Sequence, residues 1–202
     1  MKLIPESYSM KEYLEELDVV DYSHAVIQEQ VNELFYTDQT EIEKVKKAFQ
    51  FVRDEVSHSW DIQGTKVTCK ASDVLQLKEG ICYAKSNLLA AILRAEGIPT
   101  GFCYQRLMIF DTPDKGYSLH ALNGVFLSSL NRWIRIDARG NKPGVQAEFS
   151  LDEEKLAFSV REECDEKDYT TIYTKPNGNT IATLQANTNV IEMYKHQLPD
   201  YL

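Results

Sequence analysis

A cysteine, a histidine and an aspartate follow one another along the chain in the order and setting of a thiol nucleophile with its base. Cys82 begins a strongly apolar segment that predicts a helix, and His120 and Asp137 fall on segments that predict strands. A thiolate attacks carbonyl carbon, an imidazole takes up and returns the proton, and a carboxylate fixes the imidazole tautomer. The three side chains therefore predict acyl transfer through Cys82, with His120 as base and Asp137 as its orienting group.

Ionisation of the thiol cannot be the whole mechanism of such a site. A free thiol has a pKa of about 8.5, so only a few per cent is thiolate at neutral pH. A helix N-terminus and an imidazolium favour the thiolate, but complete ionisation raises its population only about 30-fold, or about 2 kcal/mol. The larger contribution must come from positioning and from hydrogen bonds to a developing oxyanion. The backbone N–H of Cys82 is one donor, and Trp60 and Gln63, in a preceding predicted loop, are candidates for the second.

The segment that begins at Cys82 predicts a buried helix, and a small sheet follows it. Residues 82–96 are apolar on nearly every side, which is typical of a helix inside a domain. Gly97 and Pro99 mark its end. Beyond them the hydrophobic pattern predicts three strands in an antiparallel meander, at residues 101–109, 118–127 and 132–138.

The turn between the last two predicted strands decides how His120 meets Asp137. If it is centred between Ser128 and Ser129, the two residues lie directly opposite each other. If it is centred one residue later, they are diagonal neighbours on the same face. Both registers allow contact.

The chain before this core predicts a helical scaffold. Apolar residues from Ile27 to Phe35 recur at helical spacing. A second helix is predicted from Thr40, where Glu43 completes a capping box. A short helical turn is predicted at residues 71–75.

The chain after the core is acidic and then helical. Residues 148–168 hold nine acidic and three basic residues, and the apolar patches 149–151 and 156–158 are candidates for edge strands. This acidic run is either a solvated face or a means of attracting an amine-bearing substrate. From about Asn179 one or two closing helices are predicted, with a hairpin turn at Asn177-Gly178 as the alternative.

Composition excludes several classes of protein. A chain of 202 residues, 43% of them apolar, can form one buried domain, and a net charge of -9 without a Lys/Arg run argues against a nucleic-acid partner. No apolar stretch has the length of a membrane span or of a secretory signal, so we expect a cytoplasmic protein with no membrane partner. Cysteines without a Cys-x-x-Cys pair predict reduced thiols and no metal or other cofactor; they are Cys69, Cys82, Cys103 and Cys164.

The motifs around the three site residues resemble those of the transglutaminase-like cysteine hydrolase superfamily, which shares its core with papain-like proteases. They span roughly residues 50–140, and they agree in residue type, order and predicted element. The matching residues are Leu75-x-x-x-x-Gly80-x-Cys82, Leu88-Leu89, Leu93-Arg94-Ala95-x-Gly97-Ile98-Pro99, His120-Ala121-x-Asn123 and Trp133-Ile134-x-Ile136-Asp137.

The resemblance implies an α+β fold with a papain/transglutaminase-like core. N-terminal helices (1–49), a buried nucleophile helix packed on an antiparallel sheet, and a C-terminal acidic and helical part (148–202) would form a single domain over 1–202. By the same resemblance Cys82 is the nucleophile, His120 the base and Asp137 the third triad member. Family members form a thioester that water or an amine resolves. The implied substrate is a peptide, a protein or a small amide, with an amine-bearing one as a variant.

Each functional interpretation has a structural alternative. The fold could serve as a binding or scaffold module whose cleft only recognises a ligand. Trp60 could be a core anchor rather than a donor, and Asn123 could satisfy backbone groups beside the base. We expect the remaining histidines to be surface or capping residues and the remaining cysteines to be packing residues; the histidines are His24, His58 and His196.

Overall fold

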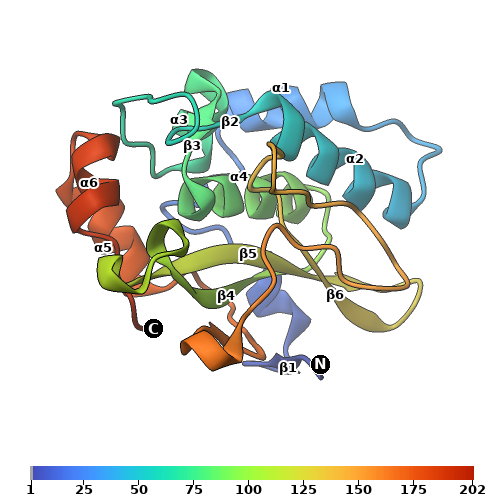
Figure 1. The fold of residues 1–202 in the computed structure, drawn as a ribbon. Coiled ribbons are helices and arrows are strands. Elements are labelled where there is room, and N and C mark those ends of the chain that lie inside the picture. The colour runs from blue at the N-terminus through green and yellow to red at the C-terminus, as the bar shows by residue number, and fades with distance from the viewer. Residues whose placement is uncertain (1) are drawn as a thin grey trace.

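The computed structural model describes residues 2–202, without the side chain of Pro113, and Figure 1 shows how its elements are arranged. Helices α1 to α4 lie on one side of the main sheet, and α5 and α6 cover one end of it. No helix within residues 2–202 is long and apolar enough to cross a membrane. The elements in chain order are β1 (Ile4–Pro5), η1 (Met10–Leu14), α1 (Ala25–Leu34), α2 (Glu41–Glu55), β2 (Ser57–His58), α3 (Ala71–Leu77), β3 (Glu79–Gly80), α4 (Cys82–Ala95), β4 (Thr100–Met108), η2 (Ile109–Asp111), η3 (Pro113–Lys115), β5 (Tyr117–Leu127), β6 (Arg132–Ile136), η4 (Glu162–Cys164), β7 (Lys167–Asp168), β8 (Thr171–Ile172), α5 (Gly178–Ala186) and α6 (Val190–His196).

A four-stranded antiparallel sheet with strand order β6-β5-β4-β7 carries His120, on β5. The three predicted strands form the expected meander, because β5 pairs with β4 on one side and with β6 on the other. Leu127 is opposite Arg132, so the β5–β6 turn is centred between Ser129 and Leu130. The second of the two predicted registers is therefore confirmed.

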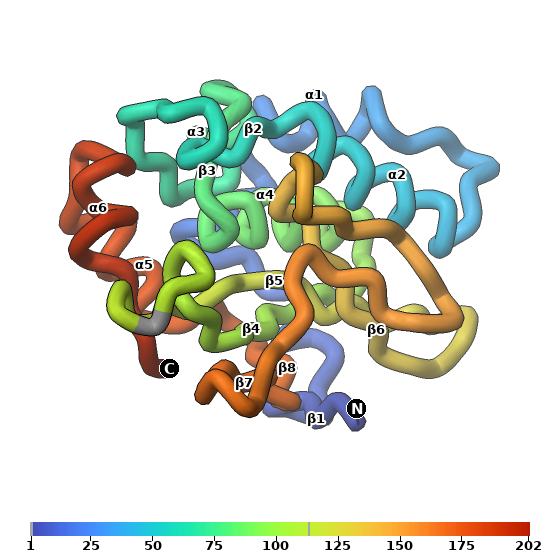
Figure 2. The backbone as a smooth tube through the Cα atoms, viewed as in Figure 1, coloured from blue at the N-terminus to red at the C-terminus, as the bar shows by residue number. Residues whose placement is uncertain are grey.

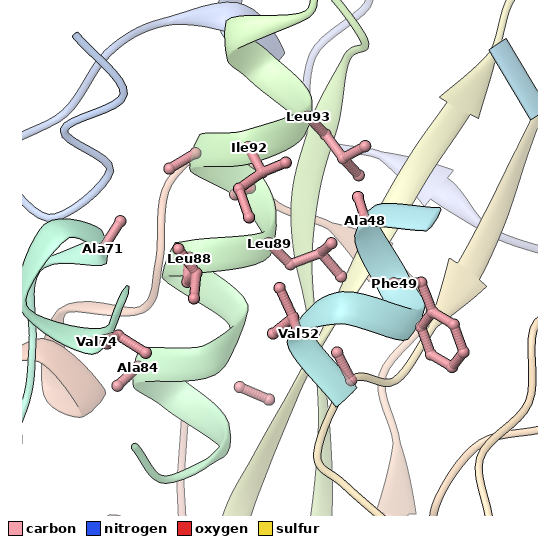
Figure 3. Packing of buried hydrophobic residues seen from close by; sticks show 14 of the residues in the cluster. Ala48, Phe49, Val52, Ala71, Val74, Ala84, Leu88, Leu89, Ile92 and Leu93 are labelled. Carbon is pink, nitrogen blue, oxygen red and sulfur yellow. The ribbon is translucent and has the colours of Figure 1, made fainter. Parts of the chain in front are cut away.

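Helix α4 is the centre of the core, as its apolar sequence predicts. Every residue from Cys82 to Arg94 is buried. Figure 3 shows side chains of α4 packed between those of α2 and α3, among them Leu88 and Leu89, which are fully buried. Removing one such leucine side chain typically costs about 2–5 kcal/mol, so this helix is held firmly in place.

The polar residues of α4 are buried because each finds a backbone partner. Lys85 donates to the carbonyl of Val56, just after α2. Arg94 donates to the carbonyls of Thr100 and Glu15. A buried donor without an acceptor is costly, so these contacts also fix the position of α4 against its neighbours.

The predicted N-terminal scaffold is present. Helix α2 begins after Thr40, whose side chain accepts from the N–H of Glu43 while the Glu43 carboxylate accepts from the N–H of Thr40. The predicted capping box is confirmed, and α1 and α3 cover the other two predicted helical segments.

The acidic segment does not form the predicted edge strands. Residues 149–151 and 156–158 have no regular secondary structure. Some backbone groups of the segment bond to each other within a loop, as where the N–H of Glu148 donates to the carbonyl of Lys155. Others bond to side chains, as where the carbonyl of Leu151 accepts a hydrogen bond from the Arg132 guanidinium. Figure 2 shows residues 148–161, in orange, crossing in front of the sheet and of α4. This path brings the segment to the candidate site.

The closing helices are present as α5 and α6. Asn177 is the N-cap of α5, and its side chain accepts from the N–H groups of Asn179 and Thr180. The alternative of a hairpin turn at Asn177-Gly178 is wrong, because the capping oxygen of Asn177 begins a helix there.

Candidate active site

Cys82 is the first residue of α4 and is placed there by a short parallel pair of strands. β3 pairs with β2, with His58 opposite Gly80, and Ile81 is the extended N-cap residue. A Cβ atom on Gly80 would lie 3.0 Å from the Thr68 hydroxyl oxygen, so this close approach favours glycine. Ile81 gives α4 no side-chain cap, so no capping group occupies the N–H groups of the first turn, which begins at Cys82.

His120 and Asp137 are brought together across the β5–β6 pair. The Nε2 atom of His120 lies 2.8 Å from Oδ2 of Asp137. The strand predicted for residues 132–138 ends at Ile136, which is opposite Asn123 of β5. Farther along β5, the N–H of Leu119 donates to the carbonyl of Pro199 in the C-terminal segment. Asp137 is therefore the first residue after the paired part of β6.

The Asp137 carboxylate is fully engaged. In addition to His120, it accepts a hydrogen bond from the N–H of Arg139 at 3.1 Å and one from the N–H of Ala157 at 3.0 Å. Burial alone would raise the pKa of Asp137, but the charge of His120 and these hydrogen bonds hold it below its usual value. Asp137 is thus a buried anion in a fixed orientation.

The imidazole of His120 is held in its charged form by the same contact. Burial alone would lower the pKa of His120, but the charge and hydrogen bond of Asp137, together with the hydrogen bond and charge of Cys82, raise it. The ring of Phe158 packs edge-on against the imidazole, with centroids 5.0 Å apart. The structure therefore brings the three predicted residues together in the order thiol, imidazole and carboxylate.

A pocket of about 710 Å³ opens over Cys82 and His120. One wall is aromatic: Trp60 stacks on Tyr194 with ring centroids 4.5 Å apart, and Phe110 lies 5.2 Å from Trp60. Phe110 is 48% exposed and adopts a left-handed backbone conformation with φ 56°. The volume falls within the range of ordinary small-molecule sites.

The two candidate oxyanion donors have different positions. Trp60 is half-buried and lines the pocket with Cys82. Gln63 is exposed and outside the lining, because its Nε2 donates to the carbonyl of Trp60 at 2.6 Å in a local turn. The structure does not support Gln63 as a donor, and Trp60 remains a candidate.

An ionic clamp joins the Trp60 loop to the loop after Asp137. The Asp61 carboxylate accepts two hydrogen bonds from the buried guanidinium of Arg139 and one from Lys142 at 2.7 Å. Burial alone would raise the pKa of Asp61, but these partners lower it to about 2. The clamp fixes the aromatic wall relative to Asp137.

Sequence reasoning missed several residues of the pocket. His58, predicted to be a surface or capping residue, is 4% exposed and lines the pocket. Phe158 and Tyr194 reach it from the acidic segment and from α6. Only His58 carried a usable signal, because it adjoins the stretch that contains Trp60.

His24 does cap α1, and Asn123 does bond to backbone, donating to the carbonyls of Ser86 and Gly101.

Comparisons with known proteins show the family to which the chain belongs. The family model of the transglutaminase-like superfamily matches residues 28–138, more than half of the chain. No curated protein sequence matches the chain. A candidate cysteine protease from Cytophaga hutchinsonii has a similar structure, with a TM-score of 0.52 and 18% identity over 66% of this chain and 43% of its own. A structure described as a TGase gives a TM-score of 0.45 and 16% identity over 91% of this chain and 51% of its own. The chain thus spans about half the length of the solved structures it matches, and it belongs to the transglutaminase-like superfamily.

Proposed function

We propose that the protein is a cysteine-dependent hydrolase or acyltransferase that acts on a peptide or another amide through a thioester on Cys82. The observation that carries this proposal is the 2.8 Å contact between His120 and Asp137 beside a cysteine at the start of a buried helix. A purely structural core has no need of a buried imidazole and a buried carboxylate at the mouth of a pocket. Membership in the transglutaminase-like superfamily supports the same reading.

In the first half of the reaction, the Cys82 thiolate attacks the carbonyl carbon of the amide. The negative charge that develops on the carbonyl oxygen is stabilised by the backbone N–H of Cys82 and by a second donor. His120, protonated in the resting pair, gives its proton to the departing amine as the C–N bond breaks. A thioester on Cys82 and a free amine result.

In the second half, water or an amine attacks the thioester. His120, now neutral, takes the proton of the attacking group, and the C–S bond breaks to regenerate the thiolate and the imidazolium. Asp137 stays ionised throughout and holds the imidazole by its Nε2 atom. The attacking group decides between hydrolysis and transfer.

A library of Gln-containing peptides incubated with a labelled amine tests this function. We expect wild-type protein to release ammonia or a peptide fragment, or to incorporate the amine, and Cys82→Ala to do none of these. Ammonia or fragment release without label identifies hydrolysis, and label in the peptide identifies transfer. If wild type and Cys82→Ala both bind peptides but neither turns them over, the fold acts here as a recognition module and the proposal is wrong.

A further inference from the structure

The pocket contains a second histidine, His58, which has no role in the reaction steps proposed above. His58 ends β2, opposite Gly80 of β3, and Cys82 follows two residues after that glycine. Both His58 and Cys82 line the same pocket. The short parallel ladder thus fixes the backbone of His58 next to the strand that leads into α4, and its side chain lines the pocket at Cys82.

The imidazole of His58 has no hydrogen-bonding partner in the described part of the protein. Its Nδ1 is one of six side-chain atoms in residues 2–202 that are enclosed by protein and bond to no protein group. Its Nε2 is not among these enclosed atoms, so Nε2 is the nitrogen that is open to the pocket. The other five belong to residues outside the pocket lining; they are Ser59, Asn87, Gln105, Arg106 and Asn123. An accessible Nε2 on an otherwise buried imidazole in the pocket wall can therefore pair with a group of a bound ligand.

The surroundings of His58 keep its imidazole neutral. Burial is the main cause that lowers its pKa well below 6.5, and the charges of Arg139, Lys85 and His120 lower it further. Asp61 opposes them, but its carboxylate is engaged by Arg139 and Lys142. A neutral imidazole has one N–H group that can donate a hydrogen bond. Because the pKa of His58 is lowered, His58 does not take up the proton that His120 exchanges with Cys82.

We propose that His58 is the second oxyanion donor, whose imidazole N–H stabilises the substrate carbonyl oxygen together with the backbone N–H of Cys82. This assignment rests on the proposed function. It gives Nε2 of His58 a partner that exists only while the substrate reacts, and a neutral donor held in place by the fold needs little reorganisation when the charge develops. Trp60 then serves mainly as part of the aromatic wall, stacked on Tyr194.

Two reactions of the same thiolate separate oxyanion stabilisation from thiol activation. With 4-nitrophenyl acetate, Cys82 attacks the carbonyl carbon, charge develops on its oxygen, and the C–O bond breaks to release 4-nitrophenolate and leave an acetyl thioester. With iodoacetamide, the sulfur displaces iodide from a CH₂ carbon and no oxyanion forms. A residue that only donates to the oxyanion changes the first rate and not the second.

Gln and Met have similar length and shape, but only Gln carries an N–H donor. We therefore expect His58→Met to lower the rate of Cys82 acetylation by on the order of 10²-fold. The rate of its alkylation by iodoacetamide should stay within about 3-fold of wild type. His58→Gln should keep acetylation within about 10-fold. In Trp60→Phe, which keeps a ring for Tyr194 but loses the indole N–H, the rates of acetylation and of alkylation should change by the same factor, because no donor to the oxyanion is lost. His58→Phe repeats the donor-free measurement in case His58→Met does not fold.

Each other outcome overturns the assignment. If the donor-free variant acetylates as fast as wild type, His58 is not a donor. If acetylation and alkylation fall together, His58 only supports the fold around Cys82. If Trp60→Phe, and not the donor-free His58 variant, slows acetylation about 10²-fold more than alkylation, the donor is Trp60. If wild type alkylates but forms no thioester, the proposed function itself fails, and the role of His58 fails with it.

Discussion

His120 and Asp137 are diagonal neighbours across β5 and β6, and their side chains meet at 2.8 Å between Nε2 and Oδ2. All partners of the carboxylate are donors: the imidazole and the N–H groups of Arg139 and Ala157. If Asn replaced Asp137, its NH₂ group would face one of these donors and could not accept the hydrogen bond that the carboxylate oxygen accepts. We expect Asp137→Asn to lower kcat/KM by on the order of 10²- to 10⁴-fold, measured by steady-state kinetics on the substrate found in the library. The exposed Asp38→Asn is the matched control, and equal activity of the two variants would contradict the orienting role.

The ion pair also predicts how stability depends on pH. Folding raises the pKa of His120 above 6.5, so its contribution is complete below pH 6.5 and is lost as the pH rises through the raised value. Folding lowers the pKa of Asp137 below 3.8, so its contribution is present above that pH and is lost as the pH falls. Each pKa unit corresponds to about 1.4 kcal/mol. We expect the difference in unfolding free energy between wild type and His120→Gln, measured by urea titration, to be largest between about pH 4 and 6.5. This difference should become smaller as the pH rises above 6.5. A gap that stays constant to pH 10 would count against the pair.

Gly80, two residues before the proposed nucleophile Cys82, should tolerate no side chain. A Cβ atom at Gly80 would lie 3.0 Å from Thr68 Oγ1 and 3.1 Å from Ala84 Cβ, so strand β3 and the start of α4 would have to separate by a few tenths of an ångström. A shift of this kind at Cys82 misaligns the attack, and we expect Gly80→Ala to lose activity by roughly 10-fold or more. In Gly178→Ala, where the Cβ would contact nothing within 4 Å, activity should be unchanged. Wild-type kinetics in Gly80→Ala would show that the junction is not tight.

The clamp between the two loops should be important for stability. The side chain of Arg139 is 4% exposed, and in Asp61→Ala its guanidinium would lose the carboxylate with which it pairs. We expect a loss of about 3 kcal/mol in unfolding free energy, measured by urea titration. Lys142→Ala removes the partner that is 39% exposed and should cost less than about 1 kcal/mol. Similar losses in both variants would mean that burial of Arg139 does not govern the clamp.

The predictable parts of the molecule are those governed by local pattern. The apolar run from Cys82 predicts the buried helix, alternation predicts the three strands, and Thr40 with Glu43 predicts the start of α2. The contact between His120 and Asp137 followed from strand pairing, although the turn length left two registers open. In each case the pattern lies within a few neighbouring residues or one hairpin.

Long-range packing accounts for what the sequence did not reveal. The acidic segment is held by bonds such as that from Ala157 to Asp137, not by a strand ladder. Tyr194 reaches the pocket only because α6 folds back against Trp60. His58 is buried by pairing with Gly80, which is distant in sequence. None of these contacts leaves a periodic pattern.

The reactivity of Cys82 toward iodoacetamide, measured as a function of pH and followed site by site by mass spectrometry, reports whether His120 activates this thiol. Burial raises the pKa of the Cys69 thiol to about 11 and that of Cys103 to about 12, so these residues are internal references for unactivated thiols. We predict that Cys82 reacts well below pH 8, where the references do not, and that His120→Ala loses this reactivity at low pH. An ordinary thiol profile for Cys82, identical in both proteins, would contradict the thiolate–imidazolium pair on which the account rests.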